Sequence, residues 1–217
     1  MLSSSLIKPL LIIGGGGHAS VLVDILRAQG REVLAVVCPD DISMRRVFSG
    51  IRHLTKDDDV LAFSPDDVLL VNGIGMLPAS GLKRTLNQYY LSHHYQFETV
   101  IAESAQVSPF ANVEVGAQIF AGAIVQAGAQ IGAHSVINSG AVIEHDCSIG
   151  HYNHIAPRAT LCGQVITQDD VYVGAGATVI QSIMLAKNAI VGAGAIVTKH
   201  LSVNQICYPS RATIKTL

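Results

Sequence analysis

Three histidines (His145, His151 and His154) lie within ten residues of one another in the segment AVIEHDCSIGHYNHIAPRAT. Most of the surrounding residues are Ile, Ala and small polar groups, and Asp146 follows His145 directly. A neutral imidazole near pH 7 can take a proton from an attacking amine or hydroxyl. Asp146 or Glu144 can orient the ring and stabilise its cation. The segment predicts a general base at His145, with metal binding and solvated turn residues as alternatives.

This segment belongs to a six-residue repeat that begins at Ile101. Stepping by six as far as Val197 gives seventeen positions, of which sixteen are Ile, Val or Leu and one is Thr167. A second column, two residues earlier, is mostly small. Such a repeat predicts short strands joined by tight corners, three sides to a coil, with the aliphatic column inside. It resembles the left-handed parallel β-helix, which we predict for residues 101–200. We expect Thr167 to mark a strained or opened coil, and Thr167→Val to be tolerated.

The repeat also places the histidines. His145 lies two residues past Ile143 and His154 immediately precedes Ile155, so neither occupies the aliphatic column. We expect both side chains to project outward near a corner rather than to be buried in the core. Cys147 falls in the small-residue column, which favours a packing role. Metal binding needs converging ligands, and these histidines leave the coil at different places, so we expect no metal.

Residues 1–100 predict a small Rossmann-like α/β half-domain. The run LLII is too short to span a bilayer and is followed at once by glycines, so we interpret it as a first strand rather than a signal peptide. The runs REVLAVVCPDD and DDVLLVNGIG predict buried strands. The glycine turn predicts a following helix with Val21, Leu22, Ile25 and Leu26 on one face and Gly30 past its end, and ASGLKRTLNQYYLSHHY predicts a second helix. An NAD-dependent oxidoreductase needs two mononucleotide halves, and there is room here for only one.

The glycine turn predicts a phosphate site. Gly14, Gly16 and Ala19 satisfy G-x-G-x-x-[GA] between a strand and a helix, where backbone N–H groups favour anions. Asp40 lies near the end of the second strand, where a ribose-binding carboxylate would be, and the loop NGIG ending at Gly75 would close the other side. A mononucleotide, as in a nucleotide-linked sugar, fits such a half-unit. The alternative is a glycine-rich connection without a ligand.

Composition narrows the possible partners. The net charge is −2, charged residues make up 14 % of the chain, and Lys and Arg form no cluster that could bind nucleic acid. The cysteines are scattered without a CxxC pair, which fits reduced thiols in a cytoplasmic protein without membrane insertion.

The whole chain resembles the NeuD/PglD-type bacterial sugar acyltransferases. The resemblance is carried by GGGGHA, VNGIG and VIEHDCSIGHYNHIAPRATLCG. It implies a nucleotide-sugar-binding domain at 1–100, an acetyl-CoA-binding and catalytic β-helix at 101–200, and a tail at 201–217. It also implies a homotrimer with its active site between neighbouring β-helices, and acetyl transfer from acetyl-CoA to a sugar.

The resemblance also implies roles for individual residues. His145 matches the general base, and Asp146 the acidic neighbour bonded to it, although some members carry Glu there. The residues implied in acetyl-CoA binding are His154, Ala175, Ala193 and Arg211. Those implied in nucleotide-sugar binding are Gly16, Gly17 and His18, with either Asp40 or Asp41 as the acidic contact.

The sequence thus leads us to expect N-acetylation of a 4-amino group on a nucleotide-linked amino-deoxy sugar, for surface glycans such as lipopolysaccharide O-antigen. A thioester attacked directly by a positioned amine needs a base and an oxyanion donor, but no metal or covalent intermediate. The alternatives are O-acetylation of sialic or another nonulosonic acid, and a β-helix without catalytic activity.

Overall fold

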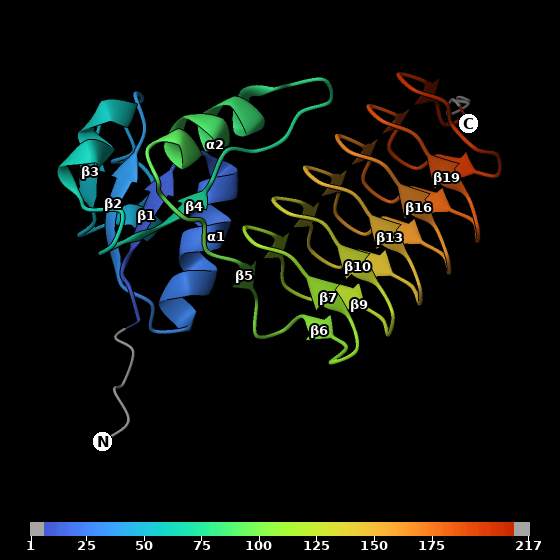
Figure 1. The fold of residues 1–217 in the computed structure, drawn as a ribbon, viewed down its shortest axis with the longest axis horizontal. Coiled ribbons are helices and arrows are strands. Elements are labelled where there is room, and N and C mark those ends of the chain that lie inside the picture. Colours follow the sequence, from blue (N-terminus) through green and yellow to red (C-terminus); the bar gives the residue numbers. More distant parts are fainter. Residues whose placement is uncertain (1–6, 211–217) are drawn as a thin grey trace, which may run out of the picture. The chain divides into compact units, whose positions relative to one another are not determined.

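The computed structural model describes residues 7–210 of the 217-residue chain. Two compact units make up the fold, Met1–Val100 and Ile101–Leu217. Figure 1 traces the chain from the N-terminal unit in blue and green to the C-terminal unit in yellow and red. Each unit is described by itself below.

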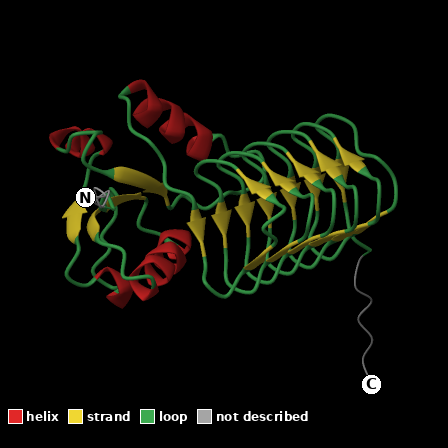
Figure 2. Ribbon diagram, turned by 60° about the horizontal axis from the view of Figure 1, so that its bottom comes forward, coloured by secondary structure: helices red, strands yellow, loops and turns green. Residues whose placement is uncertain are grey.

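The N-terminal unit is built on a parallel sheet with the strand order β3-β2-β1-β4. The strands are β1 (Leu10–Ile13), β2 (Val33–Val37), β3 (Arg52–Leu54) and β4 (Leu69–Asn72). The helices are α1 (Gly17–Ala28) and α2 (Leu82–Ser92), with the 3-10 turns η1 (Arg46–Phe48) and η2 (Asp57–Ala62). Figure 2 shows the sheet between α1 and α2. The β1–α1 turn and the loop after β4 lie at the same end of the sheet, because the carboxyl ends of parallel strands lie together.

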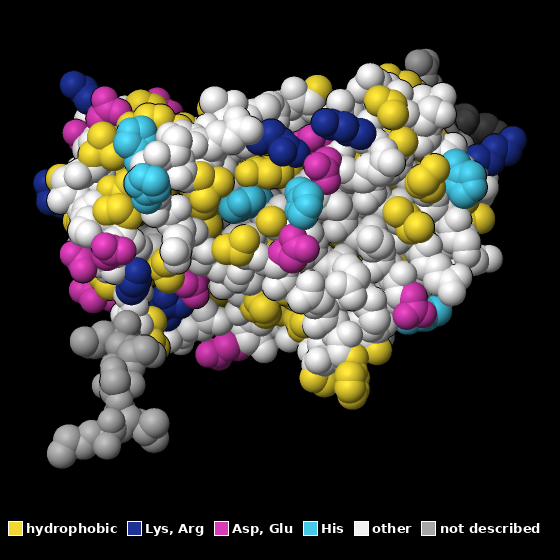
Figure 3. All heavy atoms as spheres, in the orientation of Figure 1, with side chains coloured by type: hydrophobic (Ala, Val, Ile, Leu, Met, Phe, Trp, Pro, Cys, Tyr) yellow, Lys and Arg dark blue, Asp and Glu magenta, His cyan; other side chains and the backbone are white. Residues whose placement is uncertain are grey.

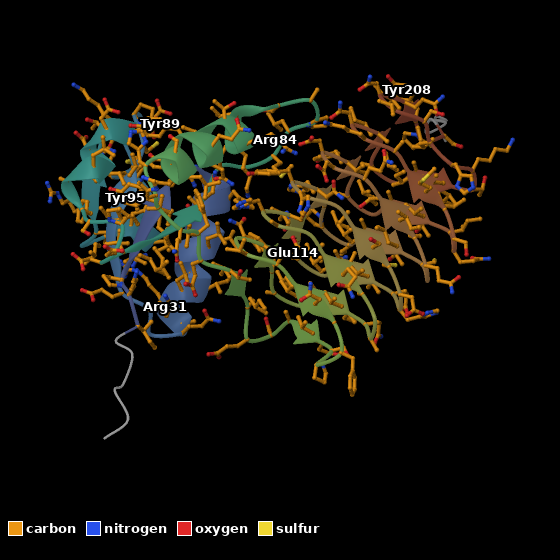
Figure 4. The ribbon with its side chains drawn as sticks, in the orientation of Figure 1. Arg31, Arg84, Tyr89, Tyr95, Glu114 and Tyr208 are labelled. Carbon is orange, nitrogen blue, oxygen red and sulfur yellow. The ribbon has the colours of Figure 1, made fainter. Side chains whose placement is uncertain are left out.

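Strand β1 is central and all four of its residues are buried, as its unbroken apolar run predicts. The sequence did not predict β3, because this edge strand is three residues long and two of them are exposed and polar. Around the sheet, the tyrosine side chains are anchored through their hydroxyl groups. Tyr95, labelled in Figure 4, donates to the carbonyl oxygens of Val60 and Phe63 at 2.8 and 2.6 Å.

The C-terminal unit is a left-handed parallel β-helix, as predicted. Two-residue strands pair with the strand one coil away, eighteen residues along the chain, as Gln130 does with Ser148. The strands form three sheets of seven, six and five strands, which Figure 2 shows as the sides of a stack of coils. The strands are β5 (Val100–Ile101), β6 (Gln106–Val107), β7 (Asn112–Val113), β8 (Gln118–Ile119), β9 (Ile124–Val125), β10 (Gln130–Ile131), β11 (Val136–Ile137), β12 (Val142–Ile143), β13 (Ser148–Ile149), β14 (His154–Ile155), β15 (Thr160–Leu161), β16 (Ile166–Thr167), β17 (Tyr172–Val173), β18 (Thr178–Val179), β19 (Met184–Leu185), β20 (Ile190–Val191), β21 (Ile196–Val197) and β22 (Ile206–Cys207).

The aliphatic column fills the interior of the coils, where its residues from Ile119 to Val197 are at most 3 % exposed. The region that we assigned to a tail begins by continuing this architecture. Strand β22 pairs with β20, so that Ile190 lies beside Ile206. The last coil therefore closes over sixteen residues instead of eighteen, and its strand extends the seven-stranded sheet.

A third hexad column, which the sequence analysis missed, turns the corners. The residue three positions after each interior aliphatic has a left-handed backbone from Gly116 to Gly194, with φ between 54° and 78°. Glycine adopts this conformation without strain, whereas a side chain there costs about 1–2 kcal/mol. Eight positions nevertheless carry side chains: His134, Asp146, Tyr152, Arg158, Gln164, Asp170, Ser182 and Asn188. Eight corners thus hold a side chain on a closely defined backbone.

Thr167 contradicts our expectation of a strained or opened coil. Strand β16 pairs in register with β13 and β19, and Thr167 is 3 % exposed. Its hydroxyl oxygen accepts hydrogen bonds from the side-chain amide of Asn153 and, at 3.2 Å, from the N–H of Gly150. Asn153 is itself fully buried and accepts a 2.7 Å bond from the N–H of Val171. Thr167 is polar because it completes a buried network.

The expected tolerance of Thr167→Val is therefore withdrawn. The substitution leaves the amide of Asn153 buried without its acceptor, which should lower the free energy of unfolding by about 1–3 kcal/mol. Urea denaturation measures this difference, with Thr198→Val at an exposed position just after β21 as the control. Equal midpoints for Thr167→Val and the unmodified protein would contradict the role given to this network.

Candidate active site

His145 and Asp146 form a hydrogen-bonded pair at the corner between β12 and β13. The Nδ1 atom of His145 lies 2.9 Å from Oδ2 of Asp146, and both side chains are exposed, at 60 % and 59 %. A carboxylate only accepts hydrogen bonds, so Nδ1 carries the proton and Nε2 of the neutral ring is left as the acceptor. The left-handed backbone of Asp146 (φ 58°) sets the direction in which its side chain leaves the main chain. A pair in this arrangement can act chemically as a base with an orienting acid.

His154 does not have the exposed position that we expected. Its side chain lies on β14, just before the interior Ile155, but the residue is only 6 % exposed. The imidazole stacks on Tyr172 with ring centroids 5.1 Å apart, and its Nε2 lies 3.3 Å from Nδ2 of Asn138. These neighbours on the same sheet enclose the ring.

His151 is held by a separate set of contacts on the next corner. Its Nδ1 lies 3.0 Å from the N–H of Ala133 and 3.4 Å from Oε2 of Glu114, which is labelled in Figure 4. Its own backbone N–H donates to Asp169 at 2.9 Å. Across residues 7–210, no group of three His, Cys, Asp or Glu side chains is arranged to hold a metal ion.

Ala175 and Ala193 occupy equivalent exposed corner positions in successive coils. The N–H of Gly194 donates to the carbonyl oxygen of Ala175 at 2.9 Å, which ties the two corners together. Such corners leave backbone groups open to an extended ligand that runs along the stack. Arg211, the other residue implied in acetyl-CoA binding, lies outside the described residues.

The glycine turn after β1 opens into free space at the start of α1. Gly16 precedes the helix, and a β-carbon added to Gly16 or Gly17 would meet no atom within 4 Å. The first N–H groups of a helix lack carbonyl partners within it and favour an anion. A β-carbon on Gly75 would lie 3.6 Å from Cβ of His18, so the loop after β4 adjoins this turn. The structure thus brings these four predicted residues together.

A pocket of about 220 Å³ lies beyond the end of β2. Its lining residues are Asp41, Ile42, Ser43, Arg45, Phe48, Ser49, Ile51 and His53. The N–H and hydroxyl of Ser43 donate to Asp41 and lower the pKa of its carboxyl group. Asp40 and Asp41 are both exposed, but only Asp41 is among the residues that line this pocket. The sequence analysis did not identify Arg45 and His53, because neither belongs to a recognisable motif.

The pocket adjoins the glycine turn within the same unit. A β-carbon on Gly15 would collide with the side chain of Ile42 and approach Sγ of Cys38 within 2.9 Å. Nη1 of Arg45 lies 3.4 Å from Oγ of Ser20 in the first turn of α1. A ligand with a phosphate at the turn can therefore extend a second group into the pocket.

Charged side chains are dispersed over the molecular face drawn in Figure 3. There, the Lys and Arg side chains of the described residues appear singly or in small groups among acidic and His side chains. No helix among the described residues is both long and apolar enough to cross a membrane.

Comparison with known proteins identifies the family. The PglD N-terminal domain matches residues 9–78, and the bacterial transferase hexapeptide model matches residues 128–163. PerB from Caulobacter crescentus, solved in complex with CoA and GDP-perosamine, is 31 % identical over 97 % of this chain and 98 % of its own, with a TM-score of 0.84. The chain belongs to the NeuD/PglD-type sugar acetyltransferases.

Other members of the NeuD/PglD-type family show the same likeness. The acetyltransferase domain of PglB from Neisseria gonorrhoeae FA1090 is 25 % identical, with a TM-score of 0.81, over 93 % of this chain and 97 % of its own. The GDP-perosamine N-acetyltransferase of Escherichia coli O157:H7 is 28 % identical over 85 residues. That match spans 39 % of this chain and only 33 % of the curated relative.

Cys147 is packed inside the β-helix beside the His145 corner and is a poor nucleophile. Its side chain is fully buried, and Sγ lies 3.2 Å from the carbonyl oxygen of Cys162. Burial raises the pKa of the Cys147 thiol to about 11. The thiolate is the reactive form, so this family member does not present Cys147 as an acyl acceptor.

We expect Cys147 to resist alkylation. With its pKa raised from 9.0 to about 11, the thiolate at pH 8 is about a hundredfold scarcer than for an ordinary cysteine. Iodoacetamide labelling of the folded protein, mapped by peptide mass spectrometry, should be slower at Cys147 by at least that factor than in urea. Equal labelling rates in the two states would show that the thiol is accessible and ionised.

Proposed function

We propose that this protein transfers the acetyl group of acetyl-CoA to the amino group of a nucleotide-linked amino-deoxy sugar. The observation that carries the proposal is the His145–Asp146 pair, exposed at a β-helix corner with Nε2 left to accept a proton. The open glycine turn of the N-terminal unit supplies a phosphate site. The Caulobacter relatives, which were solved in complex with CoA and GDP-perosamine, support this pair of substrates.

The reaction is a direct attack. The sugar amine adds to the thioester carbonyl carbon, while Nε2 of His145 removes a proton from the amine nitrogen. Asp146, held 2.9 Å from Nδ1, stabilises the imidazolium that forms. As the C–S bond breaks, the imidazolium returns the proton to the departing CoA sulfur. The products are the N-acetylated sugar and CoA, and the enzyme is unchanged.

Acetyl-CoA is assigned to the β-helix. The exposed corners at Ala175 and Ala193 lie one coil apart and suit the extended pantetheine chain. His154 and Arg211 remain proposed contacts, and His154 is only 6 % exposed. The negative charge that develops on the carbonyl oxygen needs a donor, and the backbone N–H of Gly163 beside His145 is our candidate.

The nucleotide is assigned to the N-terminal unit. Its phosphates would meet the turn at Gly16, Gly17 and His18, and its base or ribose would enter the pocket that Asp41 lines. The carboxylate of Asp41 stays ionised well into the acidic range because Ser43 donates to both of its oxygens. GDP is the first nucleotide to test, because GDP-perosamine is the ligand named for the Caulobacter relatives.

We further propose a homotrimer in the cytoplasm that serves surface-glycan synthesis, including lipopolysaccharide O-antigen. The outward row of the six-stranded sheet supports self-association. It carries Ile124, Val142, Thr160 and Thr178, which are half-buried, and Ile196, which is 70 % exposed. Three copies around an axis would cover such rows and enclose the His145 corners.

The first experiment follows thiol release from acetyl-CoA with Ellman's reagent, using 4-amino sugars linked to GDP, UDP and dTDP. We expect turnover with one of them, and His145→Ala should lower kcat at least about a hundredfold because the general base is lost. His151→Ala is the matched control, since His151 occupies the same position of the next hexad and holds separate contacts.

Two results would redirect this proposal. Turnover with sialic or other nonulosonic acids, and none with amino sugars, would establish O-acetylation instead. No thiol release with either group of substrates, together with an unchanged fold in His145→Ala, would favour a β-helix without catalytic activity.

Asp41→Ala should raise KM for the nucleotide sugar about tenfold while leaving KM for acetyl-CoA unaltered, because hydrogen bonds to a charged group contribute about 1.5–3 kcal/mol. Steady-state kinetics with each substrate varied in turn makes the measurement. Asp40→Ala tests the other assignment. If that variant alone raises KM for the nucleotide sugar, then Asp40 is the contact and the pocket assignment fails.

A further inference from the structure

Two glycines enclose the His145–Asp146 pair, one from the coil before it and one from the coil after it. Gly163 lies eighteen residues after His145, and Gly128 lies eighteen residues before Asp146. Strands one coil apart pair residue by residue at this spacing, as Val142 does with Thr160. Each glycine therefore stacks directly against one member of the pair.

Gly163 leaves the space that the imidazole occupies. A β-carbon at this position would lie 2.6 Å from Nε2 and 2.7 Å from Cε1 of His145. Contacts under 3.0 Å cannot persist, so the ring would have to move. The ring is 60 % exposed and free to swing outward, so the fold can absorb the methyl group while the base loses its position.

The backbone does not require glycine at 163. This glycine has no left-handed φ, unlike the neighbouring corner column. The equivalent position, two residues after each interior residue of the column, holds seventeen residues from Glu103 to Lys199, and Gly163 is the only glycine among them. Alanine stands there at 121, 127, 133, 175 and 193. The side chain is absent only in the coil that stacks on His145.

Gly128 makes the corresponding space for the acid. A β-carbon on Gly128 would collide with Oδ1 of Asp146 and lie 3.3 Å from its Cγ. The backbone here is left-handed (φ 78°), so a substitution also carries strain. Gly122 separates the two effects, because its φ is 69° and the nearest atom to its β-carbon is a backbone nitrogen at 3.9 Å.

We propose that Gly163 and Gly128 are positioning residues that hold the His145–Asp146 pair in its productive geometry. They act through the absence of a β-carbon: Gly163 keeps the ring and the space beside Nε2 in place, and Gly128 keeps the carboxylate against Nδ1. The inference rests on the proposed function for its kinetic consequence. Its structural content, the orientation and tautomer of His145, stands apart from any substrate.

The test compares Gly163→Ala, Gly128→Ala and Gly122→Ala in the full chain. Gly163→Ala should keep or slightly raise Tm, since Gly→Ala at an unstrained position restricts the unfolded chain. Its kcat should fall at least about tenfold with both KM values within about twofold, because small displacements of a catalytic group are costly. Gly128→Ala should lower kcat well below that of Gly122→Ala, which shares the strain but not the contact.

A spectroscopic measurement completes the test without turnover. The ¹⁵N signals of the His145 ring, assigned by difference with His145→Ala, report the Nδ1–H tautomer. We expect that tautomer in the unmodified protein and in Gly122→Ala, its loss in Gly128→Ala, and displaced ring signals in Gly163→Ala.

Ring signals unchanged in Gly163→Ala and Gly128→Ala would overturn the inference, whatever the substrate. Wild-type kcat in Gly163→Ala, or a KM that rises as far as kcat falls, would overturn it as well. If the unmodified protein is inactive with every substrate while the ring signals respond as expected, then the proposed function fails and the positioning role stands.

Discussion

The eighteen-residue register of the β-helix is the constraint on which the C-terminal unit depends. Its strands are only two residues long, so no strand is stable alone, and each is held by pairing with the coils before and after it. A residue and its counterpart eighteen positions away therefore lie against each other. This stacking packs the aliphatic column into one continuous core. It also places Gly163 on His145 and Gly128 on Asp146, which are distant in sequence.

The corners carry chemistry because their backbone is so closely defined. From Gly116 to Gly194 a left-handed residue closes each turn, and where it is not glycine its side chain leaves the backbone in a defined direction. Asp146 occupies such a position and meets Nδ1 of its neighbour His145 at 2.9 Å. The hydrogen bond is made within one corner, and the glycines of the coils on either side leave the space that both side chains occupy. In the N-terminal unit, a glycine likewise allows two segments to pack closely. A β-carbon on Gly73, in the loop after β4, would lie 2.6 Å from Cβ of Ala19 in α1.

Polar groups inside the core of the β-helix are held by hydrogen bonds to one another. Ser135, Asn153 and Thr167 replace small or aliphatic residues, and each is at most 3 % exposed. Oγ of Ser135 accepts the N–H of Asn153 at 2.9 Å and donates to the carbonyl oxygen of Gly150 at 2.7 Å. Buried polar groups persist when every member is satisfied, and a network of this kind is harmed by removing one partner. Because the sequence repeats one hexad, buried polar residues such as these are among the few features that distinguish one coil from another.

The sequence by itself determined the β-helix, the small α/β half-unit and the neighbouring positions of His145 and Asp146. These follow from local patterns: a hexad period, a glycine turn between an apolar strand and a helix, and two adjacent titratable residues outside the core column. Tertiary structure alone decided the burial of His154 beside Tyr172, the pairing of Thr167 with Asn153, and the gathering of Asp41, Arg45 and His53 around one pocket. Each of these depends on which side chains meet across coils or loops. Spacing fixes the direction in which a side chain leaves the backbone, whereas its burial and its partners depend on what packs against it.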